Sequence, residues 1–125
     1  MNLTMVLKWI GYYKLTKENI EKFVPTGAGV YVLGVEKKDG KIRHVYVGQT
    51  KSLEDRMFQY LNKDTDNGCL LNHLDKHIVY FKVAEVGLQS DRDACERALY
   101  DRYETECNDP DKIPDVEPAD INFTN

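Results

Sequence analysis

The 125-residue sequence contains no apolar run that approaches the length needed to span a membrane. Its first eight residues also lack the layout of a secretory signal peptide. There are only three cysteines, Cys69, Cys95 and Cys107, and their odd number and unpaired spacing argue against a disulfide framework. These absences predict a protein of a reducing compartment, and we expect a cytoplasmic location without membrane contact.

An excess of positive charge is also absent, since the formal net charge is −4 and the pI is about 5.4. Segment 109–125 alone carries a net charge of −4, and residues 1–60 carry +4 against −4 for residues 61–108. The acidic balance argues against tight non-specific binding to duplex nucleic acid, which depends on neutralising phosphates. The net positive charge of residues 1–60 would attract a polyanion modestly.

Both ends of the chain lie outside the strongest patterns. Three prolines and five acidic residues interrupt segment 109–125, which has neither helical nor strand periodicity. We expect an acidic, partly disordered tail, and the alternative is a charged flap that mimics nucleic acid or contacts a partner. Residues 1–26 are expected to form an N-terminal extension packed on the domain. Its aromatic cluster, Trp9, Tyr12 and Tyr13, either packs on the core or stacks on unpaired bases.

Two short β-branched and aromatic runs flank a turn signal. The first begins with Gly29-Val30-Tyr31, and the second ends with Tyr46-Val47-Gly48. Between them, Asp39-Gly40 is typical of a hairpin turn, because glycine takes a positive φ without steric cost and aspartate tolerates it. The pattern predicts two antiparallel strands joined by a tight turn.

Alternation along these strands predicts which side chains share a face. Tyr31 lies on one face of the first strand, and Tyr46 is expected to share a face with His44 and Ile42 on the second. An antiparallel pairing can bring the two phenols to the same surface of the sheet. By spacing alone, two tyrosines on core strands are more often core aromatics than functional groups.

Helical patterns follow the hairpin. Ser52 is expected to cap a helix over residues 53–61, on which Arg56 and Tyr60 stand one turn apart. Further on, Ser90 is expected to cap a helix that carries Glu96 and runs from residue 94 to 106. A third strand is expected over residues 78–84. The order of elements predicts an α+β fold, a small, mostly antiparallel three-stranded sheet flanked by helices.

Cys69, His73 and His77 recur at a spacing of four, which would align them on a helix and could suggest zinc. A fourth ligand at matching spacing is absent, and three leucines between residues 70 and 74 give this helix an apolar stripe. We therefore expect a core helix here in preference to a metal site.

Taken in order, these segments resemble the GIY-YIG nuclease family. The two triplets are variants of the family's paired motifs, and Arg56 has the family's spacing after the second triplet. Tyr60 looks like the Tyr or His that follows that Arg by one turn. Glu96 lies in a segment similar to the metal-binding one, and Asn108 stands where the family often ends in Asn. The resemblance covers residues 27–108, and it implies a GIY-YIG catalytic domain there.

The resemblance implies a metal-dependent endonuclease that hydrolyses DNA phosphodiester bonds. Glu96 would hold Mg²⁺ (or Mn²⁺), Arg56 would stabilise the phosphate, and a tyrosine would accept the proton from water. We favour Tyr31 as this base and Tyr46 as the residue that orients water or phosphate. A free phenol has a pKa of about 10, so a base near neutral pH needs a neighbouring cation. Some relatives carry Lys directly after the second triplet, where this chain has Gln49.

Further residues are expected to contact the DNA around this site. They are Lys41, Arg43, His44, Gln49, Thr50, Lys51 and Asn108. The alternative hypothesis is a non-catalytic GIY-YIG-like module that binds nucleic acid or a protein partner through the same groove. No helix-turn-helix or zinc-finger pattern follows Asn108, so a targeting protein partner is part of the hypothesis.

Overall fold

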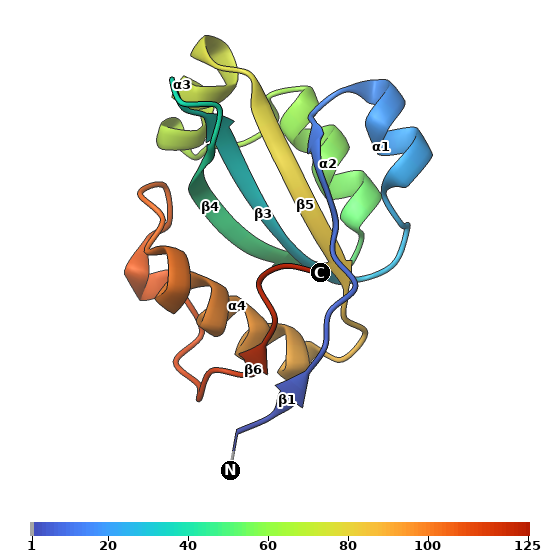
Figure 1. Ribbon diagram of the computed structural model, residues 1–125, viewed down its shortest axis with the longest axis vertical. Coiled ribbons are helices and arrows are strands. Elements are labelled where there is room, and N and C mark those ends of the chain that lie inside the picture. Colours follow the sequence, from blue (N-terminus) through green and yellow to red (C-terminus); the bar gives the residue numbers. More distant parts are fainter. Residues whose placement is uncertain (1) are drawn as a thin grey trace.

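The computed structural model describes residues 2–125. The strands are β1 (Thr4–Met5), β2 (Ile10–Lys14), β3 (Gly29–Glu36), β4 (Ile42–Thr50), β5 (Val79–Glu85) and β6 (Asp120–Ile121). The helices are α1 (Lys17–Phe23), α2 (Leu53–Leu61), α3 (Gly68–Lys76) and α4 (Gln89–Tyr103), with a 3₁₀ turn, η1, at Pro110–Lys112. Helices α1 and α2 lie on one face of the central sheet and α4 on the other (Figure 1). Within this described part, no helix combines the length and apolar character needed to cross a membrane.

The central sheet has four antiparallel strands in the order β2-β5-β3-β4, so the prediction of three strands is wrong. The additional strand is β2, which pairs with β5 at one edge. Its sequence, Ile10-Gly11-Tyr12-Tyr13-Lys14, is short and contains a glycine, so no alternating pattern marks it as a strand. Pairing with β5, which satisfies backbone groups along the strand, decides its conformation.

The β3–β4 hairpin confirms the predicted turn. Gly40 has a φ of +82°, and its N–H donates to the Lys37 carbonyl at 3.0 Å. The register shifts between Leu33 and Gly34, which pair with Tyr46 and His44, so Val45 is an extra residue on β4. This bulge puts His44 and Tyr46 on opposite faces, and the expectation that they share one is wrong.

Each face of the sheet has its own apolar core. Tyr31, Leu33 and Val45 pack beneath α1, α2 and α3, and we call this side the α2 face. Val32 and Leu99 belong to the second cluster, beneath α4, and we call that side the α4 face. Both faces of β3 are therefore buried, as the nearly complete burial of the strand shows. Alternation along β3 assigns its residues to the two cores as the sequence predicts.

Helix caps agree with the sequence at α2 and disagree at α4. Ser52 accepts a hydrogen bond from the Asp55 N–H at 3.3 Å, which confirms the predicted N-cap. Helix α4 begins at Gln89 and ends at Tyr103, and no side chain caps its N-terminus. The predicted Ser90 cap is wrong, because Ser90 already lies inside the first turn. Glu104 ends the helix in the left-handed conformation, with a φ of 46°.

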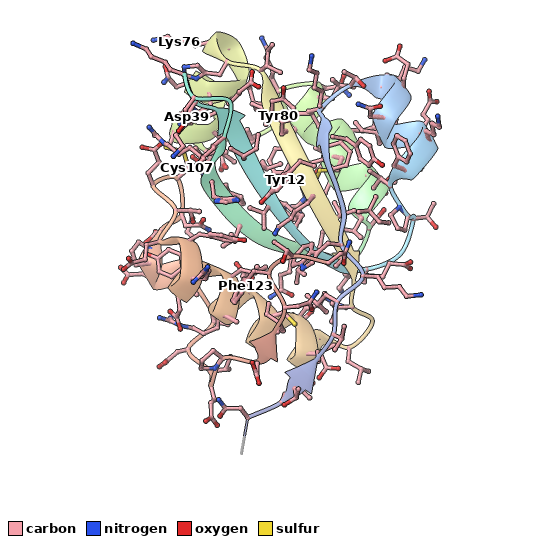
Figure 2. The ribbon with its side chains drawn as sticks, in the orientation of Figure 1. Tyr12, Asp39, Lys76, Tyr80, Cys107 and Phe123 are labelled. Carbon is pink, nitrogen blue, oxygen red and sulfur yellow. A yellow bond between two sulfur atoms is a disulfide. The ribbon has the colours of Figure 1, made fainter. Side chains whose placement is uncertain are left out.

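Residues 3–9 and 119–125, the two ends of the chain, are bound together on the α4 face. Tyr12 and Phe123 mark this region in Figure 2. The Asn122 side chain exchanges two hydrogen bonds with the backbone of Leu7, and β6 pairs in parallel with β1. The Lys82 ammonium lies 4.5 Å from the centre of the Trp9 ring and donates to the Phe123 carbonyl. Burial lowers the pKa of Lys82 to about 8.

This packing differs from the partly disordered tail that composition predicts, because three apolar side chains of the tail, Ile113, Ala119 and Ile121, are buried. Trp9 is buried in the same packing, with 6% of its surface exposed. Tyr13 stacks on Phe23 of α1 with ring centres 3.9 Å apart. Trp9 and Tyr13 of the aromatic cluster therefore pack on the protein.

Candidate active site

The candidate site lies at β4, the edge strand of the central sheet. An edge strand is reached from both faces, so side chains from α2 and from α4 can meet beside it. Segment 105–108 covers part of this edge. The Cys107 N–H donates to the Val45 carbonyl at 2.9 Å, and the Asn108 amide both donates to and accepts from the backbone of Val47, at 2.9 Å each. Asn108 is thereby held by two hydrogen bonds in one orientation.

Three tyrosines meet on the α2 face of the sheet. The ring centres of Tyr31 and Tyr46 lie 6.2 Å apart, as an antiparallel pairing predicts. Tyr60 of α2 completes the group, and its hydroxyl shares a 2.7 Å hydrogen bond with the Tyr31 hydroxyl. Tyr31 is fully buried, whereas Tyr46 is only partly buried. The sheet thus presents Tyr46, and not Tyr31, toward solvent.

Burial sets the acidity of these phenols. It raises the pKa of Tyr31 well above its usual value, and the neighbouring Tyr60 and Tyr46 raise it further. It also raises the pKa of Tyr46 to about 12, with further contributions in the same direction from Tyr60 and Glu96 and an opposing one from Arg56. In the protein alone, both phenols are therefore protonated at neutral pH.

Glu96 reaches the site from α4, where it is only 8% exposed. Burial raises the pKa of its carboxyl, a hydrogen bond from Gln49 works against this rise, and Asp93 adds to it. The Gln49 amide donates to Glu96 Oε1 at 2.9 Å and to Asp93 Oδ1 at 2.7 Å. Of the ion pairs found within residues 2–125, none involves Glu96. A buried carboxylate beside a second one, without a cationic side chain, fits a divalent cation.

Two adjoining cavities contain most of the expected residues. The first has a volume of about 490 Å³, and its lining includes Tyr46, Arg56, Tyr60, Glu96 and Asn108. The second, of about 450 Å³, is lined by Gln49, Thr50 and Lys51 among others. Arg56 lines both, so the two cavities form one continuous surface across the β4 edge. Tyr31 lines neither of them.

Three other expected contacts lie away from these cavities. Lys41 is exposed in the β3–β4 turn. Arg43 pairs with Glu106, and His44 stacks on Tyr103 of α4 with ring centres 3.9 Å apart. The bulge at Val45 is what directs His44 to the α4 face.

Sequence reasoning missed Asp93 and Gln89 as neighbours of the site. Gln89 donates to Gln49 Oε1 at 2.7 Å and to Asp93 Oδ1 at 2.8 Å, which extends the network from Gln49 along α4. The spacing of Asp93 three residues before Glu96 could have indicated that both lie on one helix face. Gln89 gave no comparable signal, because the sequence pattern placed it before the helix.

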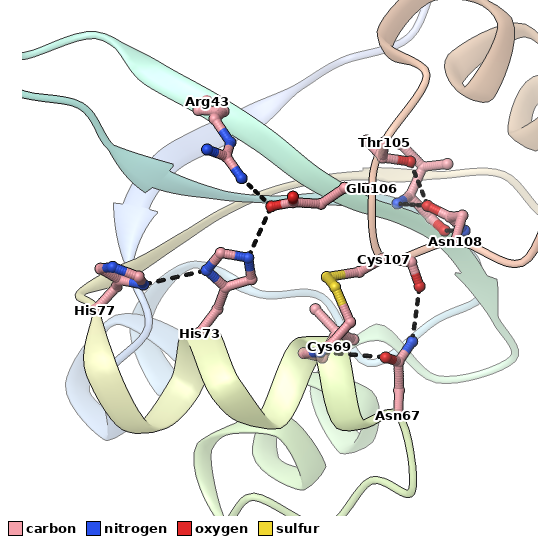
Figure 3. Close-up of a disulfide and its surroundings, with 11 residues drawn as sticks. Arg43, Asn67, Cys69, His73, His77, Thr105, Glu106, Cys107 and Asn108 are labelled. Atoms are coloured by element: carbon pink, nitrogen blue, oxygen red, sulfur yellow. Dashed lines mark hydrogen bonds and ion pairs between the residues drawn. A yellow bond between two sulfur atoms is a disulfide. The ribbon is translucent and has the colours of Figure 1, made fainter.

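The expectation that no disulfide forms is wrong. Cys69 and Cys107 are joined across 38 residues, with their Cα atoms 5.3 Å apart (Figure 3). Neither the spacing of the cysteines nor their odd number indicates this pair, because only the tertiary fold brings the start of α3 beside segment 105–108. Cys95 lies on α4 as a buried free thiol, and burial raises its pKa to about 11.

Comparison with solved structures finds the N-terminal GIY-YIG endonuclease domain of UvrC from Thermotoga maritima. Its structure with magnesium as the catalytic divalent cation has a TM-score of 0.55 and 24% identity, and covers 75% of this chain and 100% of that chain. A point mutant with a tyrosine replaced by phenylalanine, bound to its catalytic divalent cation, gives the same TM-score and coverage at 23% identity. No protein-family model and no curated protein sequence matches this chain.

This likeness shows that the chain has the GIY-YIG endonuclease fold, which confirms the resemblance read from the sequence at the level of the fold. The residues that carried the resemblance lie beside one another around β4, in the arrangement described above.

Proposed function

We propose that this chain is a metal-dependent endonuclease that hydrolyses DNA phosphodiester bonds. One observation carries the proposal: Tyr46, Arg56, Tyr60, Glu96 and Asn108 come from four separate segments and line a single cavity. Packing alone gives no reason for a phenol, a guanidinium and a buried carboxylate to meet at a solvent-filled surface. A phosphodiester needs a proton acceptor, a cationic stabiliser and a metal ligand, and these residue types supply them.

Glu96 would hold the cation, Mg²⁺ or Mn²⁺, since its carboxylate is buried and pairs with no cationic side chain among residues 2–125. When bound, such an ion polarises a phosphate oxygen and stabilises the charge that develops there. The Gln49 amide holds the carboxylate in place, and its second hydrogen bond, to Asp93, fixes the amide itself. Arg56 would bind two phosphate oxygens with its planar guanidinium, where the two cavities join.

We assign the proton acceptor to Tyr46, in place of Tyr31. A general base must reach the proton of the attacking water, and Tyr46 lines the cavity while Tyr31 is fully buried. Tyr31 then acts as a positioning residue, whose hydroxyl holds Tyr60 through their shared hydrogen bond. The charge of Arg56 lowers the pKa of both phenols, so the assignment rests on access to the cavity alone.

The DNA would cross both cavities, with Lys51, Thr50 and Gln49 beside the strand and Arg56 at the scissile phosphate. We take residues 27–108 as the catalytic unit, and a protein partner as the means of targeting, since the charge balance favours weak DNA binding. A cytoplasmic location is also part of the proposal. There the Cys69–Cys107 pair would be reduced to two thiols.

One observation favours the non-catalytic module as a second candidate. The pKa of Tyr46 is about 12, which leaves its phenol protonated at neutral pH unless the bound cation and substrate change its surroundings. A module would use the same cavity surface for binding, and it would not respond to the metal with cleavage.

The test compares plasmid, single-stranded and branched DNA with Mg²⁺, Mn²⁺ and a chelator. We expect cleavage that requires the metal and disappears in Glu96→Gln, since the carboxamide is a weaker cation ligand of nearly equal size. Glu21→Gln, at an exposed position of α1, is the matched control and should cleave like the native chain. Metal-independent DNA binding without cleavage of any substrate would establish the module instead.

A further inference from the structure

Next to the candidate active site, where Cys107 lines the larger cavity, one group of metal-ligating side chains lies between α3 and segment 105–108. Cys69 Sγ, a ring nitrogen of His73 and Cys107 Sγ all lie within 4.8 Å of one another. Cys69 and His73 come from α3, whereas Cys107 comes from the loop after α4. Two cysteines and a histidine are donors that zinc prefers in proteins. The spacing in the sequence aligned Cys69 and His73 but favoured a core helix over a metal site, and it gave no sign of Cys107.

The surroundings of His73 are those of a metal-ligating imidazole. Its side chain is 7% exposed, and Nε2 lies 2.8 Å from Glu106 Oε1 (Figure 3). Its other nitrogen, Nδ1, lies 3.1 Å from Nδ1 of His77, one turn further along α3. Ligating histidines usually bond a second polar group through the nitrogen that does not hold the metal, which fixes the ring orientation.

We propose that the reduced chain binds one Zn²⁺ ion through Cys69, His73 and Cys107, with Glu106 as the fourth ligand. Carboxylate oxygen is an accepted zinc ligand, and Glu106 directly precedes Cys107. Its Oε1 lies 2.8 Å from His73 Nε2 and also pairs with Arg43, so zinc would replace both of these contacts. His77 then holds the ring of His73 from the opposite side through Nδ1. This site is separate from the proposed endonuclease function and does not depend on it.

The disulfide and the zinc site are alternative states of the same two sulfurs. A dithiol reductant donates two electrons to the Sγ–Sγ bond and leaves as a cyclic disulfide, and its two protons pass to Cys69 and Cys107. Zinc then replaces both thiol protons, which are released to solvent, and the metal is held by two thiolates. In a tetrahedral site each Zn–S distance is about 2.3 Å. Two sulfurs bound to one zinc ion therefore lie further apart than two sulfurs bonded to each other.

Both the disulfide and the zinc site would link the start of α3 to Cys107, the residue before Asn108. The Asn67 side chain, which caps α3, also donates to the Cys107 carbonyl at 2.9 Å. Asn108 in turn bonds the β4 edge through its amide. Zinc bound at Cys107 would therefore hold this loop in place under reducing conditions, where the disulfide no longer does.

The experiment uses the full chain, reduced with a dithiol that is then removed by gel filtration without oxygen. Titration with Co²⁺ should give thiolate-to-cobalt charge-transfer absorption and the visible bands of a tetrahedral ion, and both signals should saturate at one equivalent bound to the cysteines. Zn²⁺ should displace the cobalt and abolish these bands. The oxidised chain should show none of them, because its sulfurs are bonded to each other. Cys95→Ala, which removes the buried free cysteine of α4, should give the native spectrum.

Single variants then test each ligand. Cys69→Ser, Cys107→Ser and His73→Gln should lose more zinc affinity than the about 10–100-fold expected for an outer partner. Glu106→Gln should lose more affinity than His77→Gln, which removes only that outer partner. Should His77→Gln lose more, the assignment of Glu106 as fourth ligand is overturned. The native chain decides the main point without any variant: if the reduced, folded protein shows no thiolate-to-cobalt absorption, no such site exists.

Discussion

The hydroxyl groups of Tyr31 and Tyr60 share a hydrogen bond of 2.7 Å beneath the candidate active site. Tyr31 comes from the central strand β3 and is fully buried, and Tyr60 comes from α2. The bond therefore links the sheet to the helix that also carries Arg56. It leaves Tyr46 as the strand phenol that lines the cavity, which is why we expect the two strand tyrosines to differ in function.

Tyr46→Phe should reduce cleavage by about 10²–10⁴-fold, the usual effect of a missing general base. Because the pKa of Tyr46 is about 12, the reactive deprotonated fraction of the native chain rises about tenfold per pH unit below that value. Initial rates measured with Mg²⁺ from pH 6 to 9 should rise accordingly in the native chain. The rise should vanish in Tyr46→Phe.

Tyr31→Phe is the comparison, because it also removes one phenol hydroxyl from the same group. It should retain the pH dependence and lose less activity, while the free energy of unfolding falls by about 0.5–1.5 kcal/mol from the lost bond to Tyr60. Equal losses in the two variants with an unchanged pH profile would show that neither phenol is the base.

Gly48→Ala should destabilise the fold by about 1–3 kcal/mol through overpacking. A Cβ atom at position 48 would lie 2.4 Å from the Tyr31 hydroxyl and 2.5 Å from its ring carbon, and this buried ring has no room to move. Gly68→Ala is the matched control, since a Cβ there meets nothing within 4 Å and alanine favours the first turn of α3. Urea denaturation compares them, and equal stabilities would refute the steric argument.

Asn122→Ala should lower the free energy of unfolding by about 1–3 kcal/mol, because it leaves the N–H and carbonyl of Leu7 without their partner. Deleting residues 109–125 should destabilise the chain further, since buried Ile113 and Ile121 are lost with it. Chemical denaturation measures both effects. A truncated chain as stable as the native one would mean that the tail does not contribute to the fold.

Neutralising the tail without removing it tests its electrostatic effect separately. Asp111→Asn, Asp115→Asn and Glu117→Gln change exposed side chains, so the packing of the tail is kept. The triple variant should bind DNA more tightly than the native chain at low salt, and the difference should fade as salt rises, because repulsion of phosphates is screened. Fluorescence anisotropy at two salt concentrations measures this. Weaker binding would indicate that these acids contact a partner or metal.

His44 should make stability depend on pH below neutrality. Burial lowers its pKa to about 4, with smaller contributions from Lys82 and Lys37. As pH falls from 6.5 toward 4, the unfolded chain takes up a proton that folded His44 does not, so the free energy of unfolding decreases. His44→Phe keeps an aromatic ring against Tyr103 and should flatten this part of the profile. Denaturation midpoints at pH 7, 6 and 5 provide the check, and an unchanged slope would contradict the expectation.

The sequence by itself determined the elements whose signals are local. Asp39-Gly40 specifies a turn through the positive φ of glycine, Ser52 caps α2 through its own side chain, and alternation assigns the residues of β3 to two faces. These features need only a few neighbouring residues, so the printed sequence suffices to locate them. The order of the triplets, Arg56, Tyr60 and Glu96 was also enough to indicate the GIY-YIG fold.

Only the tertiary structure decided the rest, because it depends on contacts between segments far apart in the sequence. Pairing with β5 makes residues 10–14 a fourth strand, and one extra residue at Val45 moves His44 to the opposite face from Tyr46. Folding also brings Cys107 to Cys69 across 38 residues and buries Tyr31 while Tyr46 reaches the cavity. Neither register nor burial is encoded in a short stretch; both follow from how the whole chain satisfies its backbone and apolar groups.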